Sequence, residues 1–278
     1  IAGELGKFLM DGSLYRGSKP VMWSPVEKTA LAEAEVEYHD HTSTTIYVGF
    51  PVIKTENDAV ADAKIVIWTT TPWTMPGNRA VAYGKDIDYV AIEVAAVAED
   101  SMVSVGDKLI VAEALLEAFS GACGVTESTV TSAFQGATLA GTICAHPLRG
   151  QGYDFDVPAL AAGFATTDEG TGIVHIAPGH GADDWVLGMD NGVEVPQTVS
   201  EDGTYFEHVP LFAGQHVYKC NDGVAEVIRE AGGLLGKGKL VHRYPHSWRS
   251  KKPLIFRNTA QWFISMDNAD LRQRAVEH

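Results

Sequence analysis

The chain has 278 residues, of which 45% are hydrophobic and 21% charged, as expected of a soluble globular protein with one large domain. Its formal net charge of −15 argues against nucleic-acid binding over the whole surface. No apolar run approaches the roughly 18 residues that a membrane-spanning helix needs, and the segment IAGELGKFLMDG at 1–12 is not a signal peptide.

The first elements along the chain are a helix at 5–15, a strand at 19–24 and an extended segment at 30–38. Short β-branched runs bounded by Gly, Pro, Asn or Asp follow. They predict strands at 46–53, 63–70, 79–83, 89–94, 108–112 and 172–177. Helices are expected at 112–119, 181–191 and 216–232, the last ending at Gly232-Gly233. Because strands and helices do not alternate regularly, the predicted fold is a β-rich mixed α/β domain on a curved sheet or barrel, with flanking helices.

The three cysteines, Cys123, Cys144 and Cys220, are widely spaced and form no CxxC pair. They indicate neither a zinc knuckle nor a disulfide framework, so a reduced, cytoplasmic compartment is expected. The chain lacks an initiator Met and stops within a charged helical pattern. Both ends are therefore expected to be cuts in a longer protein.

A basic segment near the C-terminus interrupts this acidic composition. Residues 231–266 contain no Asp or Glu and carry +7, whereas the rest of the chain carries −22. Such a basic strip on an acidic body suits docking onto phosphates in one orientation, although a solvated strand with scattered lysines has the same composition. The candidate phosphate-binding side chains are Lys237, Lys239, Arg243, Arg249, Lys251 and Lys252, and Arg257 completes the strip.

The segment TTTPWTMPGN at residues 69–78, here called the threonine loop, follows an apolar strand and carries four hydroxyl groups. Pro72 and Pro76 stop the strand and are unsuited to a helix interior, so a rigid turn at a strand end is predicted. Hydroxyl groups both donate and accept hydrogen bonds, so several together can hold a sugar, a carbonyl group and a water molecule. The alternative is an ordinary hydroxyl-capped turn.

A second segment, GTGIVHIAPGHGADD at residues 170–184, is predicted to run from a strand through the glycine loop, Pro178–Gly181, into a helix. Strand alternation puts His175 on the face opposite Val174 and Ile176. The glycines allow the backbone to approach a ligand closely. This segment is therefore the second candidate for a binding site.

Asp183 and Asp184 fall in the first turn of that helix, where one carboxylate can cap free N–H groups while the other faces a pocket. Three other interpretations of the segment are weaker. A dinucleotide fingerprint needs a third Gly after Gly-Thr-Gly, and a serine triad needs a GxSxG elbow that the sequence lacks. A metal site of His175, His180 and Asp184 has no HExxH or HxH spacing to support it.

Together these segments resemble the editing insertion of the isoleucyl-tRNA synthetases over nearly the whole chain. Residues 16–38 are similar to the incoming arm of that insertion, and residues 246–267 to its outgoing arm. Thr71 followed by Pro72, and the sequence PGHG at 178–181, favour the isoleucyl type over the valyl and leucyl types. The resemblance implies an incoming arm at 1–35, an editing core at 36–235 and an outgoing arm at 236–278.

The resemblance implies a hydrolase that removes valine from mischarged tRNA(Ile), with valyl-adenylate as a second candidate substrate. One methylene contributes only about 1–3 kcal/mol to discrimination, so a second site that admits only the smaller side chain is useful. The implied partners are the aminoacylated 3′ end of tRNA(Ile) and the remainder of the synthetase in the same chain. Editing is expected to need no cofactor or metal, and a monomer without a membrane partner is expected.

The synthetic signatures of the family, His-Ile-Gly-His and Lys-Met-Ser-Lys-Ser, are absent, so amino-acid activation is not expected of this chain. Three alternatives remain open at this point. They are a catalytically inactive tRNA-docking module, an editing domain of the valyl or leucyl type, and a β-rich metal hydrolase.

The resemblance also implies roles for single residues. Asp184 is expected to bind the α-ammonium group of the substrate as a charge-assisted pair, and His175 to line the wall that rejects isoleucine. Thr70 and Thr71 are the other residues expected to be catalytic, and Trp73 either packs against the adenosine or fills the base of the loop. The substrate-binding set is completed by Thr69, Thr74, Asn78, Gly179, His180 and Asp183. Water is expected to attack the ester directly, with the ribose hydroxyl or α-amine of the substrate as base.

Overall fold

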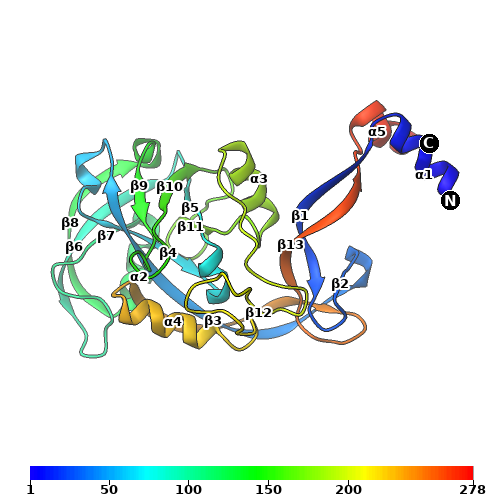
Figure 1. Ribbon diagram of the computed structural model, residues 1–278. Coiled ribbons are helices and arrows are strands. Elements are labelled where there is room, and N and C mark those ends of the chain that lie inside the picture. The colour runs from blue at the N-terminus through cyan, green and yellow to red at the C-terminus, as the bar shows by residue number, and fades with distance from the viewer. Residues whose placement is uncertain (278) are drawn as a thin grey trace.

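The structure, a computed structural model, describes residues 1–277 and consists of a β-rich body with a projecting arm (Figure 1). The strands are β1 (Leu14–Ser24), β2 (Thr29–Ala30), β3 (Val36–Lys54), β4 (Lys64–Thr69), β5 (Ala80–Tyr83), β6 (Asp88–Val97), β7 (Lys108–Ala112), β8 (Val125–Gln135), β9 (Ile143–Ala145), β10 (Asp156–Ala161), β11 (Ile173–Ile176), β12 (Leu234–Ser247) and β13 (Ile255–Ile264). The α-helices are α1 (Ala2–Met10), α2 (Leu116–Cys123), α3 (Ala182–Asp190), α4 (Asn221–Glu230) and α5 (Leu271–Glu277). Within residues 1–277, no helix has the length and apolar character needed to cross a membrane.

The body is built on a ten-stranded sheet that partly closes on itself. The strand order is β12-β3-β9-β10-β5-β11-β4-β7-β6-β8, and β3 pairs in addition with β4. This extra pairing joins six strands into a ring that runs from β3 through β9, β10, β5, β11 and β4 back to β3. Strand β3 can close the ring because its 19 residues pair with β12, β4 and β9 along its length. The predicted β-rich mixed fold on a curved sheet or barrel is therefore confirmed.

Apolar side chains fill the ring, because alternate residues of each strand point inward. Ile46, Val48 and Phe50 of β3 are fully buried. They belong to a single cluster that reaches the threonine loop through Trp73 and Met75. Each such side chain stabilises the fold by about 1.5–3 kcal/mol. The candidate site is therefore attached directly to the main core.

The longest pairing in the body joins β3 to β12, and it runs antiparallel over the whole of β12. Beyond it, β1 pairs antiparallel with β13, and the short β2 adds a third strand. The chain thus reaches and leaves the body through neighbouring strands, and Figure 1 shows this ribbon carrying α1 and α5 away from it. Of the two implied arm boundaries, residue 36 begins β3, whereas residue 236 lies inside β12.

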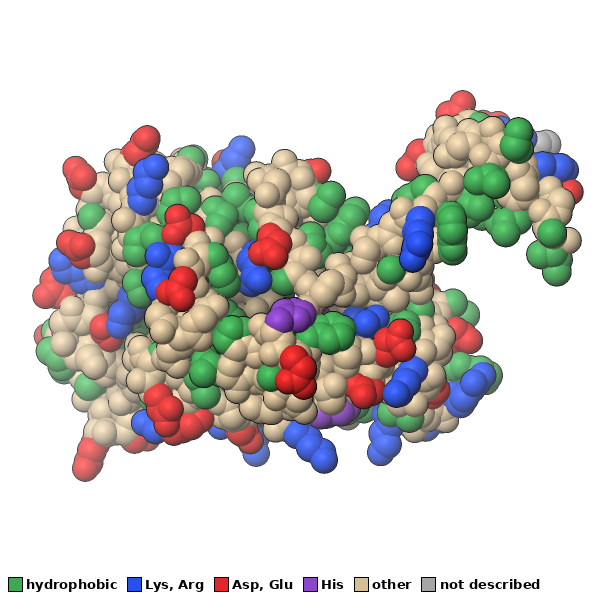
Figure 2. Space-filling model, in the orientation of Figure 1, with side chains coloured by type: hydrophobic (Ala, Val, Ile, Leu, Met, Phe, Trp, Pro, Cys, Tyr) green, Lys and Arg blue, Asp and Glu red, His purple; other side chains and the backbone are tan. Residues whose placement is uncertain are grey.

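The far end of the arm presents apolar side chains on its surface. Helix α1 has no buried residue, and Leu5, Leu9 and Met10 are exposed. Figure 2 shows this group in green at the tip of the arm. The tip of the arm therefore adds nothing to the core of the body.

The six strands predicted in the middle of the chain each overlap an observed strand, but other elements differ. The first helix ends at Met10, because Gly12 adopts a left-handed φ of +79°. Residues Glu33–Glu35 form a 3₁₀ turn inside the segment predicted to be extended. Helix α4 begins at Asn221, since His216 forms a β-bridge with Thr204 instead of a first helical turn. The strands that the sequence does not predict are β8, β9, β10, β12 and β13.

Candidate active site

The two segments singled out in the sequence meet at one edge of the sheet. Strands β4 and β11 are parallel neighbours, with Val174 opposite Trp68. The carboxyl ends of parallel neighbours lie at the same edge. The threonine loop follows β4 and the glycine loop follows β11, so the pairing brings them together across about 100 residues of sequence.

The threonine loop is more regular than the predicted turn, because Pro72–Gly77 form a 3₁₀ helix, η3. Pro72 occupies its first position, where a missing N–H is harmless. Pro76 lies inside the helix and cannot donate to the Trp73 carbonyl three residues earlier. The hydroxyl group of Tyr205 donates to that carbonyl instead. An outside donor thus explains why the prediction that proline excludes a helical interior was wrong here.

Three of the four threonine hydroxyl groups form a chain along the loop. Thr71 Oγ1 lies 3.2 Å from Thr69 Oγ1 and 3.3 Å from Thr74 Oγ1. Thr74 Oγ1 donates to the Thr71 carbonyl at 2.8 Å. Thr70 stands apart and borders two cavities of about 410 and about 90 Å³. Within residues 1–277 the Thr70 hydroxyl has no hydrogen-bond partner, so it is the one that can meet a ligand directly.

His175 of β11 forms hydrogen bonds to the threonine loop, and these bonds determine which ring nitrogen carries the proton. Asn78 Nδ2 lies 2.8 Å from the Ala80 carbonyl oxygen and 2.8 Å from His175 Nδ1. Since a carbonyl only accepts, this amide nitrogen donates to both. His175 therefore carries its proton on Nε2 and donates to Thr74 Oγ1 at 2.9 Å. Burial lowers the pKa of His175 to about 3, with a smaller effect of nearby His180, so the ring stays neutral.

His180 anchors the glycine loop to residues outside it. Its Nδ1 donates to the Phe256 carbonyl at 2.9 Å, and its Nε2 accepts from Thr198 Oγ1 at 2.6 Å. Burial lowers the pKa of His180 to about 4. The Trp73 ring, only 6% exposed, packs edge-on against this imidazole at 4.9 Å and fills the base of the threonine loop. Among the residues described, no cluster of three His, Cys, Asp or Glu side chains is suited to a metal.

Asp184 closes the glycine loop from the first turn of α3. Its Oδ2 accepts the Ala177 N–H at 2.8 Å, whereas Asp183 is exposed. A Cβ at Gly181 would come within 2.7 Å of the Asp184 carboxyl carbon, so a side chain at position 181 would displace this carboxylate. Burial raises the pKa of Asp184 to about 6, opposed by the Ala177 hydrogen bond and reinforced by the charge of Asp183.

Asp184 also lacks a cationic partner in the part of the chain that the structure describes. No Lys, Arg or His of residues 1–277 forms an ion pair with it. A partly buried carboxylate without an ion-pair partner favours binding of an external cation, because removal of water strengthens the attraction between the two charges. The glycine loop therefore carries one negative charge without an ion-pair partner in residues 1–277, and the neighbouring threonine loop carries a row of hydroxyl groups.

Comparison with known proteins identifies the family. The family described as "tRNA synthetases class I (I, L, M and V)" matches residues 2–278. The chain belongs to the class I tRNA synthetases.

Two similar class I synthetases show how much of such a protein this chain represents. "Isoleucine--tRNA ligase" of Gluconobacter oxydans (strain 621H) is 53% identical over 290 residues, which cover 99% of this chain and 30% of the relative. "Isoleucine--tRNA ligase" of Pelagibacter ubique (strain HTCC1062) is 51% identical, covering 100% of this chain and 30% of the relative. The chain thus spans about 30% of the length of these relatives.

A solved structure entitled "The crystal structure of GlLeuRS-CP1" shares the fold. It matches with a TM-score of 0.51 and 17% identity, and covers 69% of this chain and 99% of that one. At this identity the likeness concerns the fold alone. It shows that the β-rich body of this chain has an architecture already seen in that solved structure.

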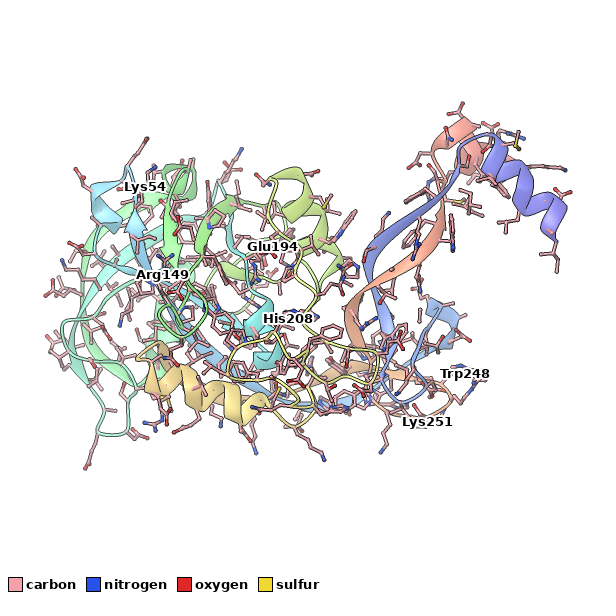
Figure 3. The ribbon with its side chains drawn as sticks, in the orientation of Figure 1. Lys54, Arg149, Glu194, His208, Trp248 and Lys251 are labelled. Atoms are coloured by element: carbon pink, nitrogen blue, oxygen red, sulfur yellow. The ribbon has the colours of Figure 1, made fainter. Side chains whose placement is uncertain are left out.

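The basic strip of this class I synthetase is partly neutralised by acidic neighbours. Three of its members form ion pairs: Lys237 with Asp222, Arg243 with Asp40, and Lys251 with Glu37. These basic side chains stay 37%, 67% and 58% exposed, so such pairs contribute little and can open towards a phosphate. Figure 3 places Lys251 and Trp248 beside the foot of the arm. The members without an ion pair in residues 1–277 are Lys239, Arg249, Lys252 and Arg257.

Arg257, the seventh basic residue of the strip, is not on the surface. It is 9% exposed, donates to the Val199 carbonyl at 2.9 Å and lies 4.9 Å from the Trp23 ring. Its inclusion in a docking strip was therefore wrong. It links the arm strands to the body of the synthetase instead.

Three side chains that the sequence offers no reason to select hold the backbone of η3; two of them, Tyr205 and His146, are buried, and Asn221 is half-buried. Asn221 accepts the Trp73 N–H at 3.0 Å, Tyr205 donates to the Trp73 carbonyl, and His146 lies 3.2 Å from the Met75 carbonyl oxygen. No motif marks them. The one indication in the sequence is Pro76, because a proline inside a helical turn leaves a carbonyl group without its donor, and that carbonyl must find a partner elsewhere in the chain.

Replacing Gly179 by alanine should destabilise the synthetase chain by about 1–3 kcal/mol. A Cβ there would lie 2.7 Å from the Pro196 carbonyl oxygen, and the Gly179 carbonyl accepts the Asn258 N–H at 2.8 Å, so the backbone cannot withdraw freely. Urea unfolding measures the effect. The matched control is Gly163→Ala, whose Cβ meets nothing within 4 Å. Equal midpoints for the two variants would contradict this packing.

Proposed function

We propose that this chain is the hydrolytic editing module of an isoleucine–tRNA ligase and removes valine from mischarged tRNA(Ile). The relatives with the highest similarity reported above carry that ligase name and exceed 50% identity over essentially the whole chain. The observation that carries the hydrolytic role is the partly buried Asp184 carboxylate, which forms no ion pair in residues 1–277 and closes the glycine loop that neighbours the threonine loop at Gly77. Asp184 accepts the Ala177 N–H of the loop after β11, which in turn lies beside β4.

Asp184 matches one feature that every aminoacyl ester has, its α-ammonium group. A charge-assisted hydrogen bond to a carboxylate is about twice as strong as a neutral one. Because no Lys, Arg or His side chain in residues 1–277 forms an ion pair with Asp184, the ammonium group supplies the missing charge. The ester carbonyl and terminal ribose are then left to the hydroxyl groups, among which Thr70 borders both cavities. Thr71 and Thr74 set the position of the loop through their hydroxyl chain.

We propose that water attacks the ester directly, without a covalent enzyme intermediate. The oxygen of water bonds to the carbonyl carbon, the ester bond to the ribose oxygen breaks, and that oxygen takes up a proton. Neither His175 nor His180 offers a free ring nitrogen as base, since both nitrogens of each ring are hydrogen-bonded. The base is therefore assigned to the ribose hydroxyl or the α-amine of the substrate, and the protein contributes by positioning and electrostatics.

The proposed partners follow from the same chemistry. The 3′ aminoacylated end of tRNA(Ile) enters the site, and the remainder of the ligase in the same chain holds the rest of the tRNA. The exposed basic side chains of β12 and of the loop after it are proposed to contact its phosphates. We place this activity in the cytoplasm, in a monomer.

Deacylation of valyl-tRNA(Ile) tests the proposal, with isoleucyl-tRNA(Ile) as the control substrate. We expect this chain to release valine at least about 10-fold faster than isoleucine, the discrimination that one methylene supports. If the folded chain releases neither, the same assay on the full-length ligase decides. Release by the full-length ligase, lost on removal of residues 36–247, supports editing that needs the rest of the tRNA site. No release in either case would overturn hydrolysis and leave a docking module.

A further inference from the structure

The backbone of η3 is held by side chains in addition to helical bonds such as Thr74 N–H to the Thr71 carbonyl and Asn78 N–H to the Met75 carbonyl. Pro76 contributes no N–H, so the Trp73 carbonyl lacks its helical donor. Asn221 and Tyr205 satisfy the amide and carbonyl groups of Trp73. The carbonyl group of Met75, two residues further along η3, is hydrogen-bonded to the side chain of His146.

His146 has a single possible proton position in this environment. Its Nδ1 lies 3.1 Å from the Leu148 amide nitrogen, which can only donate. The ring proton is therefore on Nε2, which points at the Met75 carbonyl oxygen 3.2 Å away. That oxygen also accepts the Asn78 N–H at 3.0 Å. His146 thus gives the Met75 carbonyl oxygen a second hydrogen bond near the end of η3, one residue after Thr74.

The His146 ring is fixed by its surroundings as well as by hydrogen bonds. It is 1% exposed and stacks on Tyr153 at 4.7 Å with an interplanar angle of 17°. Phe50 packs edge-on against it at 6.0 Å, and Phe155 lies tilted at 5.4 Å. Burial lowers the pKa of His146 to about 3, so the neutral donor persists at ordinary pH. A rigid, neutral donor is suited to holding a backbone group in place.

The two histidines contact neighbouring residues of η3 through different groups. His175 donates to the side chain of Thr74, while His146 donates to the main chain of Met75. We propose that His146 is a positioning residue for the hydrolysis proposed above, because it fixes the Met75 carbonyl and thereby the place of the threonine hydroxyl groups. This inference rests on the proposed function, and it adds a residue that does not touch the substrate. A displacement of about 1 Å in such a loop can lower a rate about 100-fold.

Three variants of the whole chain separate positioning from general stability. His146→Phe keeps an aromatic ring beside Tyr153 but removes the donor, and His146→Gln restores an N–H near the original Nε2. Tyr153→Phe is the matched control: it removes a buried hydrogen bond to the Pro210 carbonyl, 2.8 Å long, next to the same ring but away from η3. We expect His146→Phe to lower kcat for valyl-tRNA(Ile) deacylation 10- to 100-fold with KM changed less than about threefold. His146→Gln should recover most of kcat, and Tyr153→Phe should retain it.

The outcome decides the proposal even if a variant is unstable or the activity is absent. Equal kcat values for His146→Phe and Tyr153→Phe would overturn it, as would nitrogen NMR shifts that put the ring proton of His146 on Nδ1. If His146→Phe does not fold, the kcat of His146→Gln relative to the wild type and these shifts decide. If neither the wild-type chain nor the full-length ligase hydrolyses valyl-tRNA(Ile), the proposed function fails separately. The amide signals of Thr71 and Thr74 then decide, since positioning requires them to move in His146→Phe and not in Tyr153→Phe.

Discussion

Asp184→Asn should lower valyl-tRNA(Ile) hydrolysis about 100-fold and make the unliganded protein more stable at pH 7.5. Asparagine can still accept the Ala177 N–H through its Oδ1, so the glycine loop keeps its closing hydrogen bond. What disappears is the charge that binds the α-ammonium group, which is worth about 1.5–3 kcal/mol as a charged hydrogen bond. Deacylation kinetics and thermal unfolding measure the two effects.

The stability gain follows from the raised pKa of Asp184, which burial brings to about 6. A carboxyl group with a higher pKa in the folded state stabilises the fold most at low pH. This contribution is lost as pH rises from the unfolded value near 4 through about 6. Asparagine has no charge to bury, so it should gain about 1–3 kcal/mol over the wild type above pH 6. Hydrolysis by the wild type should conversely fall as pH decreases through about 6.

Asp183→Asn is the matched control, because Asp183 is adjacent and acidic but exposed. It should leave hydrolysis within about twofold, and it should lower the pKa of Asp184 slightly by removing a nearby negative charge. If Asp184→Asn retained full activity, another residue would have to bind the α-ammonium group. A loss of stability in Asp184→Asn at pH 7.5 would show that its carboxylate has a cationic partner in solution.

His175→Ala should allow the release of isoleucine from isoleucyl-tRNA(Ile), at least about 10-fold faster than the wild type. The imidazole occupies the junction between Thr74 and Asn78, so its removal opens space at the side of the threonine loop. The same change should destabilise the fold by about 2–4 kcal/mol, because a buried, doubly hydrogen-bonded ring is lost. Deacylation of both aminoacyl-tRNAs together with urea unfolding measures the effects.

His180→Ala provides the comparison that isolates selectivity from stability. His180 is half-buried, and its two ring nitrogens are also hydrogen-bonded, but to Phe256 and Thr198. We expect a similar loss of stability and no gain of isoleucine release. Isoleucine release by both variants would mean that loosening the loops is sufficient, and the wall assigned to His175 would be wrong.

The parts of the fold that the sequence predicts are those with local signals. Strand β7 has its predicted bounds, because an apolar run stands between a charged residue and helix formers. The threonine and glycine loops are visible because prolines and glycines interrupt apolar strands. Helix α3 begins after Gly181, as predicted, since a glycine precedes two acidic residues. Each of these signals lies within about ten residues of the element that it marks.

The parts that escape prediction depend on partners far away in the sequence. Strand β8 is largely polar and exposed, and it forms because β6 offers a complete edge for pairing. Strand β9 has three residues, too few for any alternation to be read. Nothing near His146 in the sequence points to Met75, and Arg257 looks like any other basic residue until β13 places it beside Trp23. The threonine and glycine loops could be recognised in the sequence, whereas the contacts that hold them could not.

Because β1 pairs with β13, the chain enters and leaves the body at neighbouring positions. Neighbouring strands lie about 5 Å apart, a gap that the two ends of an ordinary surface turn already span. A host protein can therefore accept the whole body in place of such a turn without opening its own core. Loss, exchange or transplantation of the body needs only a cut through these two strands, so evolution can revise it separately from its host.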